Sequence, residues 1–344
     1  MVNPSKDIII LGIESSCDDT SASITKNGEV LSNIIASQII HEQYGGVVPE
    51  LASRAHQKNI LPVVAEALKS AGISKNELSA IGFTRGPGLL GSLLVGTSFS
   101  KSLAMSLGIP LIEVNHMMAH VLAHFIKKPS VDIDPPEFPF ICLTVSGGHT
   151  QLVLVKDYLD MEVIGETLDD AVGEAFDKSA KVLGLKYPGG PIIDQLAADG
   201  NSDRFEFSEP AVKGLNYSFS GLKTQFLYFI QKGCQENSNF ISENLSDICA
   251  SWQKHLVKVL FNKLVKAAQR HNITSIAIAG GVSANSALRL KLKEIGAIEK
   301  WNYFLPDFEY CTDNAAMIAM VAHYKYIAND FSNFDTVPTA RMKF

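Results

Sequence analysis

Apolar and polar positions follow one another in blocks that predict two similar halves of an α/β protein. An apolar run at 8–13 predicts a buried strand, and after a polar turn the alternation at 21–25 predicts its return strand. The same order recurs at 140–145 and 151–155, again around a short polar turn. Two such halves predict a duplicated, two-lobed architecture with a ligand bound in the cleft between the lobes.

The segments around these strands carry helices and further strands. Residues 85–91 match the spacing of a dinucleotide-binding glycine loop, but Pro87 stiffens them, so we interpret a turn that lets a helix pack close to a sheet. The other predicted elements are a helix at 50–71 interrupted by Pro62 and ended by Gly72, strands at 80–84, 110–114 and 275–279, helices within 241–270 and a helix at 315–324.

A Pro- and charge-rich stretch at 127–139 is typical of a linker. It separates an N-terminal lobe at 1–126 from a C-terminal lobe at 140–317. We expect the last helix, at about 318–344, to pack back on the N-terminal lobe.

Composition narrows the class of protein. The chain has 344 residues, 46% hydrophobic and 19% charged, which is ordinary for a globular α/β protein of two domains or lobes. Its five cysteines are scattered without a C-x-x-C pair, which indicates a reducing compartment and no disulfide framework. No apolar run of about eighteen residues could span a membrane. We therefore expect a soluble cytoplasmic protein.

The net charge of −6 limits how the chain can meet nucleic acid. Contact must use a local basic patch or a partner, because the global field repels phosphates. The stretch 216–224 combines aromatic residues, hydroxyls and Lys223, and it could stack a base or simply cover a core.

The segment from Asn115 to His124 holds three of the nine histidines. A helix capped by Asn115 would place His116 and His120, four residues apart, on one face. Neutral imidazoles at this spacing are a common way to hold Zn or Fe. The alternative is one core and one surface histidine on an ordinary helix.

Asp313 precedes the predicted helix near the C-terminus. It could be that helix's N-cap, or it could complete a two-His, one-carboxylate metal site with His116 and His120. A zincin protease carries a general-base Glu directly after its first His, where this chain has Met117. A metal here would therefore hold or polarise a ligand and would not activate water for peptide cleavage.

Three polar turns could contact a ligand. Asp18 and Asp19 would repel a bare phosphate, so they suggest a cation bridge or acid–base role, unless they are only solvated turn residues. The turn at 146–148, Ser-Gly-Gly, offers N–H groups to an anionic oxygen, although a tight hairpin explains its glycines equally well. At 280–281 a strand ends in Gly-Gly at a helix N-terminus, which suits an anion or a ribose.

A helix predicted at 171–183 carries acidic residues on one face. Glu174 could pair with Lys178, and Asp177 with Lys181, as a surface ion-pair ladder.

Eight motifs resemble, in order, those of the bacterial-type TsaD family of tRNA threonylcarbamoyltransferases, and they span nearly the whole chain. They are Gly12–Thr20, Asn115–His120, Ser146–Thr150, Gly173–Lys178, Tyr187–Gly190, Phe219–Thr224, Gly280–Asn285 and Asp313–Met317. The resemblance implies the fold of the actin, sugar kinase and Hsp70 group (ASKHA). It also implies one Fe²⁺ or Zn²⁺ ion per subunit, held by His116, His120 and Asp313. The implied contacts of the nucleotide or adenylate are Thr144, Val145, Ser146, Gly147, Gly148, Asp177, Gly190, Asp194 and Asn285.

The implied reaction transfers the threonylcarbamoyl group of threonylcarbamoyl-AMP to N6 of adenosine 37 in tRNAs that read codons beginning with A. It forms N6-threonylcarbamoyladenosine (t6A) and releases AMP. The chain would be the catalytic subunit of a complex with TsaB-like and TsaE-like proteins, with ATP or ADP as a candidate ligand, and a separate enzyme would make the adenylate. Because the acyl group is already activated, the site needs no protein nucleophile and must orient two substrates and stabilise negative charge. Asp18 is our candidate for positioning or accepting the proton at N6.

Two other functions compete with the implied transferase activity. A metalloendopeptidase, the activity with which this family was once labelled, would need the general base that is missing beside the His pair. A non-catalytic ATP-binding regulatory module of the actin-like kind would not need His116, His120 and Asp313.

Overall fold

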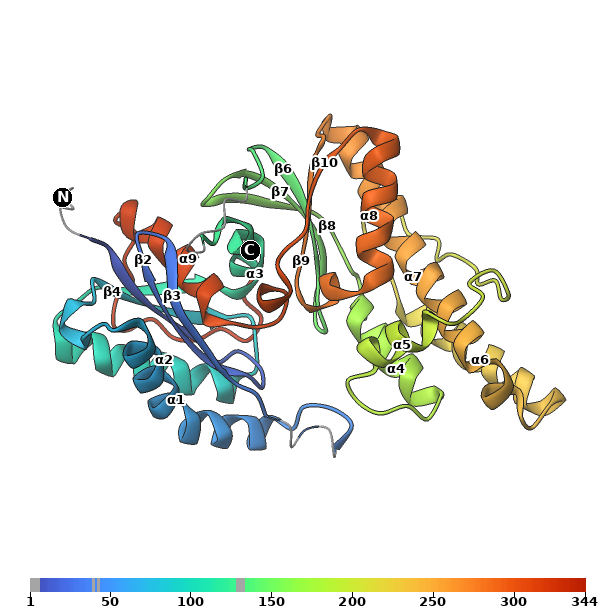
Figure 1. The fold of residues 1–344 in the computed structure, drawn as a ribbon, viewed down its shortest axis with the longest axis horizontal. Helices are drawn as coiled ribbons and strands as arrows, with labels where there is room; N and C mark the ends of the chain where they lie inside the picture. Colours follow the sequence, from blue (N-terminus) through green and yellow to red (C-terminus); the bar gives the residue numbers. More distant parts are fainter. Residues whose placement is uncertain (1–6, 39–40, 42–43, 128–133) are drawn as a thin grey trace. The chain divides into compact units, whose positions relative to one another are not determined.

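The computed structural model describes residues 7–38, 41, 44–127 and 134–344 and divides the chain into two compact units. Unit 1 comprises Met1–Pro135, Asp157–Met161 and Asp307–Phe344, and unit 2 comprises Pro136–Lys156 and Glu162–Pro306. Each unit is built around one five-stranded sheet, and Figure 1 shows helices packed against both sheets.

The two sheets have the same topology. Their strand orders are β3-β2-β1-β4-β5 and β8-β7-β6-β9-β10. The central strand β1 is antiparallel to β2 and parallel to β4, and β6 is likewise antiparallel to β7 and parallel to β9. The duplication predicted from the repeated strand–turn–strand pattern is therefore confirmed. The strands are β1 Ile9–Glu14, β2 Thr20–Lys26, β3 Glu29–Ala36, β4 Ala80–Gly86, β5 Leu111–Asn115, β6 Phe140–Val145, β7 Thr150–Asp157, β8 Asp160–Glu166, β9 Ser275–Ala279 and β10 Asn302–Phe304.

Different helices cover the two faces of the sheet in unit 1. Helices α1 (Pro49–Ala71) and α2 (Leu90–Leu107) pack side by side on one face, and α9 (Ala315–Ile327) packs on the other (Figure 1). Helix α9 can approach the central strand β1 closely because residue 12 is a glycine. A Cβ at Gly12 would lie 2.4 Å from the carbonyl oxygen of Ala315. The short helix α3 (His116–Leu122) follows β5 directly.

Helix α1 runs through Pro62 without a break, so the predicted interruption is wrong. Pro62 is exposed, and the backbone carbonyl that loses its N–H partner there can be hydrated. The predicted end is confirmed, since Gly72 caps the helix in a left-handed conformation with φ 66°.

The helices of unit 2 enclose an aromatic core. Trp252 and Phe226 are buried in it with ring centroids 4.6 Å apart. Tyr217 and Phe219 are also buried in this core, so the aromatic residues of the 216–224 stretch cover a core. The helices of unit 2 are α4 Val172–Val182, α5 Gly189–Ala197, α6 Ser220–Glu236, α7 Phe240–His271 and α8 Ser286–Glu299.

The observed unit boundaries differ in detail from the predicted lobes. The first boundary lies between Pro135 and Pro136, and residues 128–133 of the predicted linker at 127–139 lie outside the described residues. The chain returns to unit 1 at Asp307, ten residues before the predicted end of the C-terminal lobe at 317. The helix predicted at about 318–344 is wrong in its extent: α9 ends at Ile327, and Asn329 follows in a left-handed conformation with φ 58°.

Residues after α9 run along unit 1 in extended and turn conformations. The backbone N–H of Ser332 donates to the carbonyl of Leu111 at 2.8 Å, and that of Thr339 donates to Arg85 at 2.9 Å. The C-terminal segment thus packs back on the first half of the chain, as predicted, but mostly without helix. In the described part of the chain, none of the helices combines the length and apolar character that crossing a membrane requires.

Candidate metal centre and ligand site

Helix α3 presents the histidine pair on one buried face. It begins directly after β5, and the side-chain oxygen of Asn115 accepts hydrogen bonds from the N–H groups of Met117 at 2.9 Å and Met118 at 3.2 Å. This is the predicted N-cap. His116 and His120 are both buried, with ring centroids 4.7 Å apart. The alternative of one core and one surface histidine is therefore wrong.

Asp313 meets both histidines at the start of α9. Its Oδ1 atom lies 3.3 Å from Nε2 of His116 and 3.3 Å from Nε2 of His120. The helix cap is the next residue, Asn314, whose side chain accepts from the N–H of Met317 at 3.0 Å, so Asp313 is not the cap. One ligand atom from each of the three residues lies within 4.8 Å of the others, a spacing that could hold a metal ion.

The buried carboxylate of Glu14 orients His116. Its Oε2 lies 3.0 Å from Nδ1 of His116 and accepts a 2.6 Å hydrogen bond from the hydroxyl of Thr84, while Oε1 accepts from the backbone N–H of Ser16. Burial alone would raise the pKa of Glu14, but the charge of His116 and the hydrogen bond with it hold the pKa below its ordinary value. When Nδ1–H donates to Glu14, the lone pair of Nε2 faces Asp313 and can bind a cation.

His120 lacks the hydrogen bonds that a buried imidazole normally makes. It is fully buried, and among the described residues neither ring nitrogen makes a hydrogen bond of good geometry: Nδ1 has no partner, and Nε2 has only the carboxylate of Asp313 at 3.3 Å. An unpaired buried polar atom is costly, and a cation bound at Nε2 would satisfy it. Two imidazoles and one carboxylate suit Zn²⁺ or Fe²⁺, so these residues fit the implied metal.

Asp18 lies in the turn between β1 and β2 and is half-buried. Burial, together with the neighbouring charge of Asp18, raises the pKa of the Cys17 thiol. No described hydrogen bond or ion pair joins Asp18 to His116, His120 or Asp313.

The predicted ligand residues of unit 2 begin at the end of β6. Thr144 and Val145 are fully buried within the strand, so neither residue presents surface to a ligand in solution. Gly147 and Gly148, in the turn that follows Ser146, are exposed, and a Cβ added to either would meet nothing within 4 Å. The turn is therefore open to a ligand, and packing does not require its glycines.

Two further predicted ligand residues of unit 2, Asp177 and Asp194, each accept hydrogen bonds from the beginning of a helix. The carboxylate of Asp177, on α4, accepts from the N–H of Gly189 at 2.8 Å beside Gly190, so the predicted Asp177–Lys181 pair is replaced by a contact with the start of α5. Burial raises the pKa of Asp177. Glu174 and Lys178 do pair, at 2.7 Å.

Asp194 lies one helical turn after Gly190 on α5. It accepts from the backbone N–H of Ser286 at 2.9 Å and from its hydroxyl at 2.6 Å. This places Asp194 beside Asn285, the N-cap of α8.

Comparison with known proteins identifies the family. The family model for TsaD, tRNA N6-adenosine threonylcarbamoyltransferase, matches residues 29–320. The chain belongs to the TsaD family. Curated relatives of that name include proteins of Riemerella anatipestifer, 61% identical over 336 residues and 98% of each chain, and Porphyromonas gingivalis, 58% identical over 337 residues, 98% of this chain and 99% of the relative.

Solved structures of HypF share the fold of this TsaD-family chain. The full-length phosphate- and nucleotide-bound form matches with a TM-score of 0.59 and 14% identity, covering 95% of this chain and 47% of that one. HypF of T. kodakarensis matches with a TM-score of 0.61 and 15% identity, covering 96% and 49%. The likeness concerns the fold alone, and it confirms the predicted α/β fold of the actin, sugar kinase and Hsp70 type.

Sequence reasoning missed Glu14 in this TsaD-family chain. The pattern treated it as the residue that breaks an apolar run and opens a polar turn, whereas it is the last residue of β1 and is fully buried. A lone acid at the end of an otherwise apolar strand was the available signal, because a fully buried Glu almost always has a charged partner.

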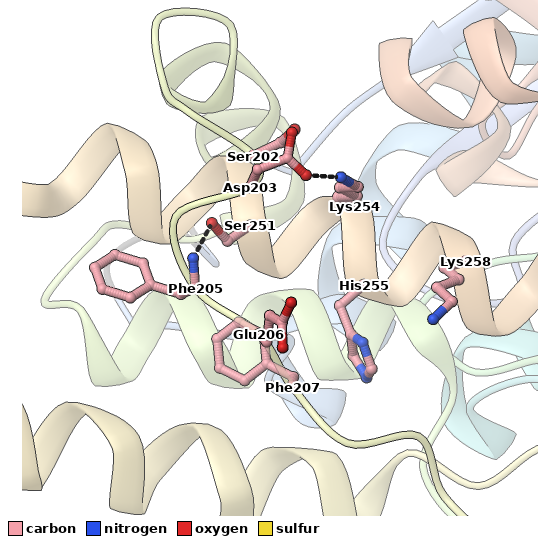
Figure 2. A pocket seen from close by; sticks show the side chains of 9 residues that line it. All are labelled: Ser202, Asp203, Phe205, Glu206, Phe207, Ser251, Lys254, His255 and Lys258. Carbon is pink, nitrogen blue, oxygen red and sulfur yellow. Dashed lines mark hydrogen bonds and ion pairs between the residues drawn. The ribbon is translucent and has the colours of Figure 1, made fainter.

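A separate hollow of about 300 Å³ lies in unit 2, lined by α7 and by residues 202–207 (Figure 2). Lys254 pairs with Asp203 there, and Lys258, which also lines it, pairs with Glu209 at 2.8 Å. Its lysines are already neutralised, and none of the predicted site residues lines it. We assign it no ligand.

Proposed function

We propose that the chain transfers the threonylcarbamoyl group of threonylcarbamoyl-AMP to N6 of adenosine 37 in tRNAs that read codons beginning with A, forming t6A and releasing AMP. The observation that carries the proposal is the convergence of His116, His120 and Asp313 in a chain of the TsaD family. The names of the curated relatives support the same activity.

The three converging residues would hold one Fe²⁺ or Zn²⁺ ion, with Glu14 fixing the ring of His116. When bound, the metal would stabilise negative charge on substrate oxygens as a Lewis acid. Since Met117 stands in place of a general-base Glu, these residues do not support peptide hydrolysis. A module that only binds ATP would not need two buried histidines beside a carboxylate, so His116, His120 and Asp313 favour the transferase.

The chemistry needs orientation more than a protein nucleophile. The N6 amine of adenosine forms a bond to the carbamoyl carbon, the bond from that carbon to the phosphate oxygen breaks, and AMP leaves with the electron pair. The amine loses one proton in this step. We assign Asp18, which is half-buried in the β1–β2 turn, as the residue that positions N6 or accepts that proton.

The nucleotide part of the substrate would bind in unit 2. The open turn supplies backbone N–H groups from Ser146, Gly147 and Gly148 to a phosphate. Thr144 and Val145 have no exposed surface, so within the proposed set they would hold the turn in place without touching the ligand. Asp177, Gly190, Asp194 and Asn285 complete the proposed set, and ATP or ADP could occupy it in place of the adenylate.

The proposed setting is a cytoplasmic complex with tRNA and with TsaB-like and TsaE-like proteins. The test is transfer from threonylcarbamoyl-AMP to a tRNA transcript with adenosine at position 37, measured as t6A by mass spectrometry in the presence of these partners. A transcript with guanosine at position 37 is the matched control. We expect t6A only with the first transcript; absence of product from both contradicts the proposal.

A further inference from the structure

Three polar side chains from three helices of unit 2 form one hydrogen-bonded row. Gln253, on α7, is buried with 5% of its surface exposed. Its amide nitrogen donates to Oδ1 of Asp194 at 3.0 Å, and its amide oxygen accepts from Nδ2 of Asn285 at 2.7 Å. Gln253 therefore bridges two residues of the proposed nucleotide set.

The direction of every bond in this row is fixed. The side-chain oxygen of Asn285 already accepts from the N–H of Leu288 at 3.0 Å, so its amide nitrogen must face Gln253. The oxygen of Gln253 is thereby occupied, and its nitrogen must face the carboxylate of Asp194. Each amide could be built in two orientations, but only this one gives every hydrogen bond of the row a donor and an acceptor.

We infer that Gln253 is a positioning residue for nucleotide binding. By holding Asn285 and Asp194 at once, it sets which N–H of Asn285 and which lone pairs of Asp194 remain available to a ligand. The inference rests on the proposed function, in which Asp194 and Asn285 contact the nucleotide. Gln253 itself is buried and need not touch the ligand.

A merely structural role predicts different kinetics from a positioning role. If Gln253 only joined α5, α7 and α8, its loss would reduce the amount of folded enzyme and lower kcat while the KM of the remaining enzyme stayed constant. If it positions Asp194 and Asn285, the folded variant should bind nucleotide more weakly and show a raised KM.

The experiment uses the full chain with its partner proteins and two variants. Gln253→Met keeps the length of the side chain and removes both hydrogen bonds. Gln253→Glu keeps an acceptor for Asn285 but places a second carboxylate beside Asp194. Gln269→Met, at an exposed position of the same helix, is the control. The readouts are ADP affinity by calorimetry, KM and kcat with threonylcarbamoyl-AMP, and the melting temperature.

We expect Gln253→Met to weaken ADP binding roughly tenfold, the order of one net hydrogen bond, and to raise KM with little change in kcat. Gln253→Glu should weaken binding further, and Gln269→Met should match the wild type. Wild-type affinity in a folded Gln253 variant overturns the inference, as does failure of both variants to fold. If the wild type itself binds no ADP and no adenylate, the proposed function fails instead.

Discussion

At the residue scale, the candidate metal centre includes a contact between Glu14 and His116 that the local sequence pattern does not predict. The spacing of His116 and His120 and the Asn115 cap are local, so helical geometry predicts them directly. Glu14 reaches His116 across a sequence separation of 102 residues, and only the folded sheet brings the two together. Gln253 was missed for the same reason, since one polar residue on a long amphipathic helix gives no sign of what it faces.

We predict that Glu14→Gln weakens metal binding about 10- to 100-fold, the range typical of removing a carboxylate behind a metal-ligating histidine. The variant keeps the side-chain shape, so the melting temperature should fall far less than for Glu14→Leu. Competition with a graded series of chelators measures the affinity. Glu113→Gln, which removes the Arg85–Glu113 pair on the same sheet, is the control and should bind metal normally. Equal metal affinity in Glu14→Gln and the wild type would refute a role for Glu14.

At the scale of elements, alternation predicts the strands around each central hairpin, and the topology confirms that they repeat. The pattern could not predict the run of α1 through Pro62, because an exposed proline breaks one hydrogen bond that water can replace. For α9, the helix predicted at 315–324 has the observed start and ends three residues early, whereas the extension to 344 is wrong. The sequence also could not show whether the aromatic residues of the 216–224 stretch are buried or stack on a base, because the same residue types serve both roles. The structure shows that Tyr217 and Phe219 are buried.

Packing of α9 on β1 yields a stability prediction. We expect Gly12→Ala to destabilise the protein by about 1–3 kcal/mol, because its Cβ would lie 2.4 Å from the carbonyl oxygen of Ala315 and force α9 away from the sheet. Urea denaturation measures the loss. Gly221→Ala is the control, because a Cβ there meets nothing within 4 Å, and it should be neutral or slightly stabilising. Equal stability of the two variants would show that α9 can move without cost.

For the turn after β6, we predict a loss of ligand affinity and little loss of stability. Gly148→Val should weaken binding of an ATP analogue much more than it lowers stability, because the Cβ has open space in the fold while its branches would obstruct the N–H groups offered to an anion. Calorimetric titration and thermal unfolding measure the two effects separately. Unchanged affinity would make this turn a simple hairpin connection.

At the scale of the whole molecule, charge restricts how the enzyme meets its proposed tRNA substrate. The chain has 36 acidic and 30 basic side chains, and two lysines of α7, Lys254 and Lys258, are paired with carboxylates. Strong attraction of RNA by the whole surface is therefore excluded. Binding must depend on a small basic set, for which half-buried Lys223 on α6 is one candidate, or on partner proteins.

We predict weak tRNA binding by the isolated chain with a shallow dependence on salt. Each neutralised phosphate adds only about 0.7 to 0.9 to the slope of log affinity against log salt. The measurement is tRNA affinity over a salt series, first for the chain alone and then with partner proteins, which should strengthen binding. A steep slope for the isolated chain, equal to roughly six or more phosphate contacts, would contradict this view of its surface.

If the chain makes t6A at a centre that needs His116, His120 and Asp313, the t6A content of tRNA must follow this protein in the cell. Mass spectrometry of nucleosides measures that content in cells depleted of the protein. Depletion should remove t6A, and the wild-type chain should restore it. His120→Ala, accumulated to the same level, should leave t6A absent, whereas His271→Ala in the other unit should restore it. Full t6A after depletion, or its restoration by His120→Ala, would contradict the account.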